Sequence, residues 1–133
     1  KGKGIRARTE IESGRNVMFY EGELLCEADA LKKEEEYKNR GDQMSYTFWF
    51  RTPLRRGRKS EWMCLDATHS THRSRLINHS KHRPNLRPEL LEVDGEWKIV
   101  FRSVRTIRRG DELLFDYGER RPEVLKAHPW LLE

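Results

Sequence analysis

The sequence predicts a β-rich fold, mainly β with few short helices, built from several small sheets in one domain. Many short strand-like stretches are separated by turn residues, helical patterns are few, and strands do not alternate with helices in βαβ order. The 133 residues can bury a real core, but with 35% hydrophobic and 37% charged residues that core should be thin. A Rossmann cofactor domain is not expected, because no strand–glycine loop–helix unit occurs near the N-terminus.

The N-terminal half is expected to hold three short strands and one long helix. Strands are predicted at residues 5–7, 16–21 and 46–50, with turn residues between them. Residues 28–39 are composed of strong helix formers, with Asp29 in the first turn, basic residues at the end and Gly41 beyond. The run of lysines and glutamates in this helix predicts a solvated face.

The C-terminal half is expected to consist mostly of strands and tight turns. Residues 51–59 contain five cations together with Pro53 and Gly57, which indicates a protruding basic hairpin loop. Further elements are expected in this order: a strand at 62–66, a short helix at 71–77, a hairpin of strands 90–93 and 97–102 around Asp94-Gly95, and a short helix at 122–127. Residues 107–110 echo residues 11–14, and both predict tight turns.

Charge and cysteine content narrow the class of protein. The net charge of +5 and a pI of about 9.4 favour acidic partners such as nucleic acid or chromatin. Cys26 and Cys64 lie far apart without a Cys-x-x-Cys pair, so we expect two reduced, packed thiols in an intracellular protein and no zinc site. No apolar run approaches about 18 residues and no signal peptide is recognisable, so no membrane role is expected. The chain lacks an initial methionine and is interpreted as a fragment.

Two compact motifs hold the chemically informative residues. Arg75-Leu76-Ile77-Asn78-His79-Ser80 places an amide beside an imidazole, and Phe115-Asp116-Tyr117-Gly118 follows 35 residues later. If they meet, they supply hydrogen-bonding groups, an aromatic wall and a phenol, which suits holding a cofactor and a nucleophile in line. The alternatives are a helix C-cap at Asn78 followed by a surface His79, and a turn tyrosine at Tyr117 that closes a strand.

The order and spacing of six motifs resemble the SET-domain protein lysine methyltransferases over nearly the whole chain. They are Lys1-Gly2-Lys3-Gly4-Ile5, Tyr20-Glu21-Gly22-Glu23-Leu24, Asp66-Ala67-Thr68, Arg75 to Ser80, Gly110-Asp111-Glu112-Leu113-Leu114, and Phe115 to Gly118. The ending His128-Pro129-Trp130-Leu131, without a cysteine-rich zinc tail, resembles the branch that monomethylates a lysine of the histone H4 tail.

This resemblance implies a SET-domain fold of several small sheets with a knot-like C-terminal crossing. The crossing would bring Asn78 and His79 against residues 115–118. The SET domain would occupy residues 1–118, with the chain beginning inside it. Residues 119–133 would form a post-SET-like helical segment without zinc.

The resemblance also implies methyl transfer from S-adenosylmethionine to a lysine amine, without a metal. Tyr117 is then the catalytic phenol. The cofactor-binding residues would be Lys1, Gly2, Lys3, Tyr46, Asn78, His79 and Trp130, and the lysine channel would be lined by Tyr20 and Phe115. Two alternatives stay open: Tyr46 and Trp130 as core aromatics, and residues 1–3 as a frayed terminus.

Four departures from the branch pattern bear on function. Phe115 stands where the monomethylating branch usually has tyrosine, so we expect monomethylation with leaky dimethylation. Lys3 stands where arginine is frequent and loses the planar fork of that side chain. The segment 66–78 looks one residue shorter. The loop 51–59 looks longer and more cationic, and it is either solvated or contacts nucleosomal DNA through Arg51, Arg55, Arg56, Arg58 and Lys59.

The predicted function is that of a histone lysine methyltransferase acting on the H4 tail in the nucleosome. The protein would work as a monomer on chromosomes in the nucleus. The alternatives are a non-catalytic chromatin-binding module that kept the fold, and a SET enzyme acting on a non-histone lysine. Retention of Tyr117 and of the pair Asn78-His79 favours an enzyme.

Overall fold

The computed structural model describes residues 4–41 and 46–116. The chain divides into two compact units, Lys1–Tyr20 with Leu76–Glu133 (unit 1) and Glu21–Arg75 (unit 2). Each unit is built on its own sheet, one of five strands and one of three. The predicted β-rich class is therefore confirmed, and the N- and C-terminal stretches of the chain meet in a single unit.

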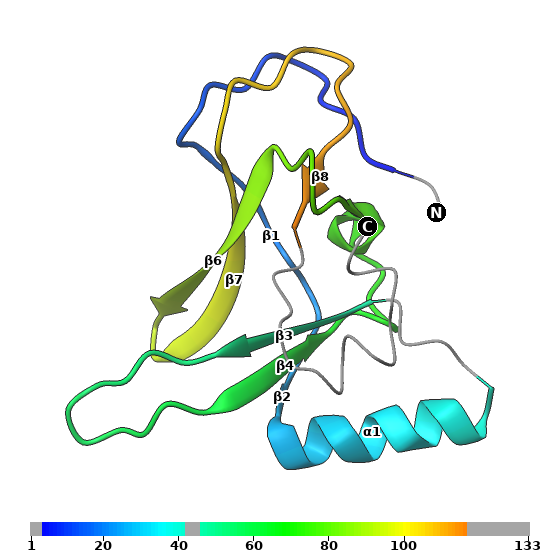
Figure 1. Cartoon of the computed structure of the whole chain (residues 1–133), viewed down its shortest axis with the longest axis vertical. Coiled ribbons are helices and arrows are strands. Elements are labelled where there is room, and N and C mark those ends of the chain that lie inside the picture. Colours follow the sequence, from blue (N-terminus) through cyan, green and yellow to red (C-terminus); the bar gives the residue numbers. More distant parts are fainter. Residues whose placement is uncertain (1–3, 42–45, 117–133) are drawn as a thin grey trace. The chain divides into compact units, whose positions relative to one another are not determined.

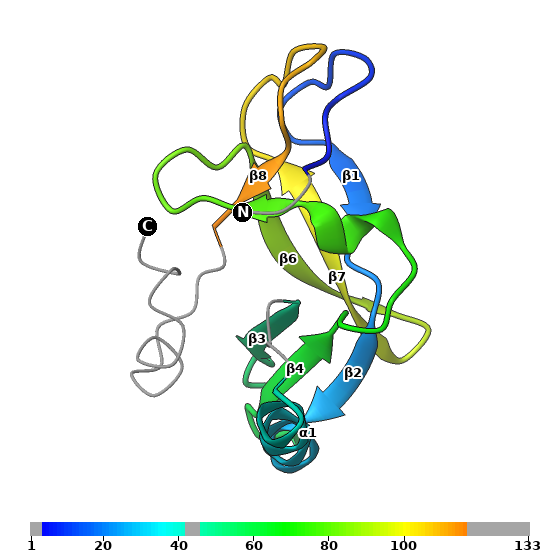
Figure 2. The same cartoon turned by 90° about the vertical axis from the view of Figure 1, so that its right-hand side faces the viewer.

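Unit 1 is a five-stranded sheet with the order β1-β7-β6-β8-β5 (Figures 1 and 2). Its strands are β1 (Asn16–Phe19), β5 (Asn78–His79), β6 (Leu86–Val93), β7 (Glu96–Ser103) and β8 (Leu114–Phe115). The hairpin β6–β7 forms around Asp94 and Gly95 as predicted, and both residues have positive φ, 51° and 81°. Two such residues are what a tight primed turn requires.

The short strand β8 lies between β5 and β6 and runs parallel to both. Asn78 is paired with Leu114 and His79 with Phe115, while Leu86 of β6 is paired with Phe115 from the other side. The two predicted motifs thus adjoin along a strand pair, as the sequence led us to expect. The part of the predicted crossing that follows Asp116 lies outside the described residues.

Three predictions for unit 1 need correction. Residues 5–7 form no strand but an isolated antiparallel bridge between Arg6 and Glu112, with backbone hydrogen bonds that join Ile5 and Ala7 to residues 110–113 on either side of it. The strand predicted at 16–21 ends at Phe19. The two similar turn segments do not each join a pair of strands as expected. They pair with each other, since Ile11 and Ile107 exchange two backbone hydrogen bonds of 2.8 Å.

Unit 2 is an antiparallel sheet with the order β2-β4-β3, and helix α1 packs on β2 and β4 (Figures 1 and 2). The elements are β2 (Glu23–Cys26), α1 (Glu27–Asn39), β3 (Thr47–Arg51) and β4 (Trp62–Asp66). Ala30 and Tyr37, two turns apart on α1, are buried against the sheet. The predicted helix is confirmed and begins one residue earlier, directly after β2.

The short helix predicted at 71–77 is confirmed as a 3₁₀ helix of four residues, η1 (Arg73–Leu76), and the Ser74 N–H is bound by Nδ1 of His72 at 3.1 Å. The prediction of two packed thiols was wrong for one of them. Cys64 is buried as expected, but Cys26 is exposed because it stands at the start of α1.

In residues 4–41 and 46–116 no helix is long and apolar enough to span a membrane. The helix predicted at 122–127 lies outside the described residues.

Candidate functional site

Asn78 and His79 form strand β5, at one edge of the unit 1 sheet. Asn78 is half-buried, and its Nδ2 donates a hydrogen bond of 2.7 Å to Oε2 of Glu112. His79 is buried, with 8% of its surface exposed. The alternative of a helix C-cap followed by a surface histidine is therefore wrong, because both residues belong to a strand and the imidazole is inside.

Asn85 holds β8 in place, and the sequence analysis did not find it. Its side chain donates from Nδ2 to the Glu112 carbonyl at 2.8 Å and accepts the Leu114 N–H at Oδ1 at 2.9 Å. Its backbone N–H binds the Leu114 carbonyl, and its carbonyl accepts the Val104 N–H. With 3% exposure, this asparagine satisfies buried backbone groups that would otherwise lack partners. In the sequence, Pro84-Asn85 suggests an ordinary turn, so no signal distinguished it.

Tyr20 and Phe115, the predicted channel residues, lie together in a buried aromatic cluster with Phe101. The ring centroids of Tyr20 and Phe115 are 6.1 Å apart, and Phe101 lies 5.3 Å from the first and 4.9 Å from the second. All three are at most 5% exposed. Phe101 of β7 was missed by the sequence analysis, which treated it only as a strand residue. Together the three rings form a dry aromatic wall in unit 1.

The backbone of Gly4 passes close to Glu112 and Asn78. A Cβ at Gly4 would overlap the Glu112 carboxylate and lie 3.2 Å from Nδ2 of Asn78. The next residue is anchored, because the Leu113 N–H donates to the Ile5 carbonyl at 2.7 Å. The glycine thus leaves room for the Glu112 carboxylate beside the backbone, where any Cβ would displace it.

Tyr46, the predicted cofactor tyrosine of unit 2, is half-buried rather than a core residue. The Arg75 guanidinium lies 5.1 Å from the centre of its ring, and Arg75 also donates to the Thr68 carbonyl at 2.9 Å. The Tyr46 carbonyl accepts the Ala67 N–H at 2.7 Å. Arg75 therefore links Tyr46 to the Thr68 backbone within unit 2.

A buried carboxylate joins α1 to the sheet of unit 2. Oδ2 of Asp66 accepts the Tyr37 hydroxyl at 2.7 Å and lies 3.7 Å from Nζ of Lys33, which also pairs with Glu23. Burial would raise the pKa of Asp66. Hydrogen bonds from the Thr68 N–H and from Tyr37, with the charge of Lys33, outweigh it and lower that pKa. The Thr68 hydroxyl contributes as a nearby dipole, since among the described residues its oxygen has no hydrogen bond of standard geometry.

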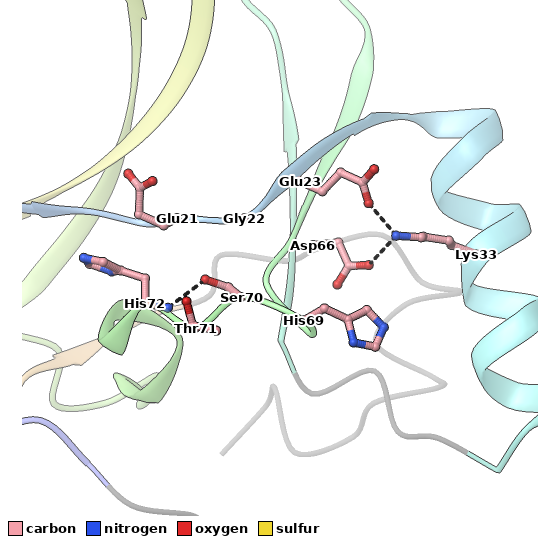
Figure 3. Close-up of a pocket in the computed structure, with 9 residues that line it drawn as sticks. All are labelled: Glu21, Gly22, Glu23, Lys33, Asp66, His69, Ser70, Thr71 and His72. Carbon is pink, nitrogen blue, oxygen red and sulfur yellow. Dashed lines mark hydrogen bonds and ion pairs between the residues drawn. The ribbon is translucent and has the colours of Figure 1, made fainter.

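This bridge borders an open cavity of about 430 Å³ in unit 2 (Figure 3). Glu23, Lys33 and Asp66 form one wall, and the loop from His69 to His72 forms another. No residue that the sequence predicted for cofactor or channel lines it. The described residues contain no group of three or more His, Cys, Asp or Glu side chains that could hold a metal ion.

The basic loop is an ordered extension of the β3–β4 hairpin, as predicted, and extends beyond the two strands (Figure 1). At its base the Thr52 N–H binds the Glu61 carbonyl at 2.8 Å, and the Glu61 N–H binds Thr52 Oγ1 at 2.9 Å. At its tip Arg55 and Arg58 form a backbone bridge. Arg55, Arg56, Arg58 and Lys59 are exposed. Arg51 is the last residue of β3 and stacks on Trp62 at 5.4 Å.

Several predicted site residues lie outside the described residues. These are Lys1, Gly2, Lys3, Tyr117 and Trp130, together with the whole segment 119–133. The described part of unit 1 ends at Asp116, directly before Tyr117.

Comparison with known proteins identifies the family. The SET domain model matches residues 2–118. The chain belongs to the SET domain family. It is 38% identical over 133 residues to the histone-lysine N-methyltransferase set-1 of Caenorhabditis elegans, covering 99% of this chain and 52% of that protein.

Solved structures agree with this assignment. CpSET8 from Cryptosporidium is 32% identical with a TM-score of 0.71, covering 85% of this chain and 51% of that one. The Chaetomium thermophilum complex ctPRC2, in an autoinhibited conformation bound to S-adenosylmethionine, contains a chain that is 33% identical with a TM-score of 0.70. That match covers 93% of this SET domain and 14% of the larger chain. The chain thus spans about half the length of set-1 and of CpSET8.

Proposed function

We propose that this SET domain is the catalytic part of an S-adenosylmethionine-dependent histone lysine N-methyltransferase. The carrying observation is the pairing of β5 with β8, which sets Asn78 and His79 beside Phe115, two residues before Tyr117. The likeness to the histone-lysine N-methyltransferase set-1 and to ctPRC2 bound to S-adenosylmethionine supports the reaction class. The proposed target is a lysine of the histone H4 tail, supported by residues 128–131, whose sequence resembles the H4 branch.

The residues present fit S-adenosylmethionine. Asn78 lies on an edge strand with its amide half-buried, and the glycine at position 4 allows the backbone to approach closely. Amide and backbone groups at a sheet edge match a ligand with an ammonium, hydroxyls and an adenine amine. Lys1, Gly2, Lys3, His79, Tyr46 and Trp130 complete the proposed contacts. When bound, the cofactor supplies a methyl group activated by a positive sulfonium.

The substrate lysine must lose a proton before its nitrogen can attack. The pKa of a free lysine is about 10.4, and a dry apolar environment lowers it because it disfavours the charged amine. The cluster of Tyr20, Phe101 and Phe115 supplies such a wall, since each ring is nearly fully buried. Tyr117 is proposed to orient the amine with its hydroxyl. The reaction then depends on alignment and exclusion of water.

The product is proposed to be monomethyl lysine with some dimethyl lysine. Phe115 packs against Tyr20 and Phe101 and brings no hydroxyl to the cluster. A tyrosine there could hold the amine by a hydrogen bond, whereas phenylalanine leaves a methylated amine free to rotate. Phe115→Tyr should therefore reduce dimethylation, which mass spectrometry of an H4 peptide measures. Trimethyl lysine as the only wild-type product would contradict the branch assignment.

The proposed partner is the nucleosome, and the protein is proposed to act on chromosomes in the nucleus. The basic loop of unit 2 is proposed to contact the nucleosomal DNA. The five cations Arg51, Arg55, Arg56, Arg58 and Lys59 would neutralise phosphates and release counterions. Changing Arg55, Arg56 and Arg58 together to glutamine should weaken nucleosome binding and reduce its salt dependence. The matched control changes three exposed arginines of unit 1, Arg8, Arg108 and Arg109. Equal effects of the two triple variants would exclude a specific loop contact.

The proposed activity is tested with methyl-labelled cofactor, nucleosomes and the variant Tyr117→Phe. Label on the H4 tail that is lost in the variant supports both the enzyme class and the phenol. Transfer to no histone despite cofactor binding would favour a non-histone lysine. Absence of cofactor binding would favour the non-catalytic chromatin module. Sedimentation of the same sample tests the proposed monomer.

A further inference from the structure

We propose that Glu112 is a positioning residue that orients the Asn78 amide, so that Asn78 presents its carbonyl oxygen to the cofactor. This inference rests on the proposed use of S-adenosylmethionine and deepens it. Glu112 belongs to the Gly110-to-Leu114 motif, for which the sequence analysis named no role. The structure shows its carboxylate in direct contact with the candidate cofactor residue.

The chemistry of the pair decides which end of the amide faces Glu112. An ionised carboxylate has only acceptor oxygens, whereas the asparagine side chain has one acceptor and one donor end. Oε2 of Glu112 lies 2.7 Å from Nδ2 of Asn78, a short distance typical of a charge-assisted bond. Turning the amide over would set two acceptors against each other. Oδ1 of Asn78 therefore points away from Glu112.

Glu112 is itself held firmly enough to act in this way. Its carbonyl accepts Nδ2 of Asn85 at 2.8 Å, and its backbone forms the bridge to Arg6. The following residue, Leu113, donates to Ile5. The carboxylate occupies the space that a side chain at Gly4 would need. Backbone contacts on both sides thus fix the direction in which the carboxylate points.

The consequence for the ligand is a requirement for a donor. Strand pairing with Leu114 fixes the backbone of Asn78, which lies at the edge of the sheet. Nδ2 of its side chain faces Glu112, so Oδ1 is the atom that remains for the ligand. S-adenosylmethionine has donors in its ammonium, its adenine amine and its ribose hydroxyls. Without Glu112 the amide can adopt both orientations, and one of them turns a donor toward a donor. Cofactor binding should then weaken by about twofold where the two orientations are equally populated, because half of the molecules present the wrong end of the amide, and by more where the reversed orientation prevails.

The first test is calorimetric titration of S-adenosylmethionine into the wild-type domain and the variants Glu112→Ala and Glu112→Gln. We expect binding to be weaker by about twofold or more for the alanine variant. Glutamine should restore most of it, because its carbonyl oxygen still accepts from Asn78. The matched control is Asp111→Asn, a neighbouring carboxylate that accepts the Arg108 N–H in an exposed turn and should bind normally. Equal affinity of wild type and Glu112→Ala would overturn the inference.

The second test needs neither cofactor nor activity. In a ¹⁵N-labelled domain the Asn78 side-chain amide protons, identified by their absence in Asn78→Asp, should be shifted and slow to exchange. They should move to ordinary solvent-exposed values in Glu112→Ala. An unchanged signal in Glu112→Ala would overturn the inference, whether or not the wild type binds cofactor. Failure of the wild type to bind cofactor would instead count against the proposed function.

A reversed pair covers the case in which Glu112→Ala does not fold. Asn78→Asp alone sets two carboxylates together and should bind cofactor poorly. Adding Glu112→Gln supplies a donor amide to that aspartate and leaves its second oxygen as an acceptor for the ligand. Binding by the double variant should recover several-fold over the single one. No recovery would overturn the inference.

Discussion

The two units of this SET domain fix their polar interiors in different ways. In unit 1 a neutral side chain, Asn85, binds two backbone groups and so holds β8 beside β6. In unit 2 a charged side chain, Asp66, collects Tyr37, Thr68 and Lys33 and so holds α1 on the sheet. An amide satisfies buried backbone without any titration, whereas a carboxylate does so only while it is ionised.

From this difference we expect the two units to differ in their stability toward acid. The residues proposed for cofactor and channel in unit 1 rest on neutral hydrogen bonds and aromatic packing, apart from Glu112. The helix of unit 2 depends on the buried charge of Asp66. Acid below about pH 4 should thus loosen unit 2 before unit 1.

The largest effect is expected from Asn85→Ala. The change leaves the Glu112 carbonyl and the Leu114 N–H without their partner inside unit 1, and each buried unsatisfied group costs about 1–3 kcal/mol. The free energy of unfolding should fall by about 2–5 kcal/mol at every pH from 5 to 8, because no charge is removed. Urea denaturation measures it.

The exposed Asn16 on β1 provides the control for this prediction. Asn16→Ala should change the free energy of unfolding by less than about 0.5 kcal/mol, as is usual for surface substitutions. A loss below about 1 kcal/mol for Asn85→Ala would mean that water replaces the amide, so that the clamp adds little to unit 1.

Asp66→Asn comes next, with an expected loss of about 2 kcal/mol at neutral pH. An amide cannot accept from both Thr68 and Tyr37 without turning its NH₂ toward one of these donors. The pKa of Asp66 is lowered in the fold, so its stabilisation is present above the unfolded pKa of about 3.9 and disappears as pH falls through the lower folded value. Urea denaturation between pH 2.5 and 7 should show the wild type losing its advantage below about pH 4. A constant difference over this range would contradict the comparison of the two units.

The sequence could predict those features of the fold that depend on residues close together in the chain. The hairpin around Asp94-Gly95, helix α1 and the basic loop follow from local signals, and all three were predicted correctly. The adjacency of Asn78-His79 and Phe115 was predicted from a family pattern and confirmed by the β5–β8 pairing. Polarity and spacing within one segment were sufficient for the hairpin, the helix and the loop, whereas the adjacency of the two motifs needed the family pattern.

The sequence did not predict the roles of three residues, Asn85, Phe101 and Glu112, because these roles depend on partners far away in the chain. An asparagine after a proline looks like a turn residue, and Asn85 takes its meaning from Leu114, 29 residues later. Phe101 looks like any strand aromatic until Tyr20 is placed beside it. The strand expected at residues 5–7 was not found for the same reason, since its pairing with residues 110–113, about 105 positions later in the chain, amounts to one bridge.

Tyr37→Phe should cost about 1–2 kcal/mol, less than Asp66→Asn, because one hydrogen bond to a charged group is lost while the ring remains packed. Burial, followed by the bond to Asp66, raises the pKa of Tyr37, so the wild-type advantage is complete below about pH 10 and declines above it. Thermal unfolding at pH 7 and pH 10.5 checks both statements. In a double-mutant cycle, the variant that carries both Tyr37→Phe and Asp66→Asn should lose less free energy of unfolding than the sum of the two single losses. Strict additivity would mean that Tyr37 and Asp66 act separately.

Lys33→Met should have the smallest effect, about 0.5 kcal/mol, because the ammonium is partly solvated and pairs chiefly with Glu23, whose side chain is 58% exposed. The bond to Glu23 is the main reason that the pKa of Lys33 is raised, so its contribution is present at neutral pH and is lost only in strong base. Raising the salt concentration from 0.05 to 1 M should remove the difference between variant and wild type in urea denaturation. A salt-resistant loss near 2 kcal/mol would instead mean that Asp66 depends on Lys33 as its counter-ion. The helix of unit 2 would then rest on an ion pair rather than on hydrogen bonds to a carboxylate, and the contrast with the neutral clamp of unit 1 would be sharper still.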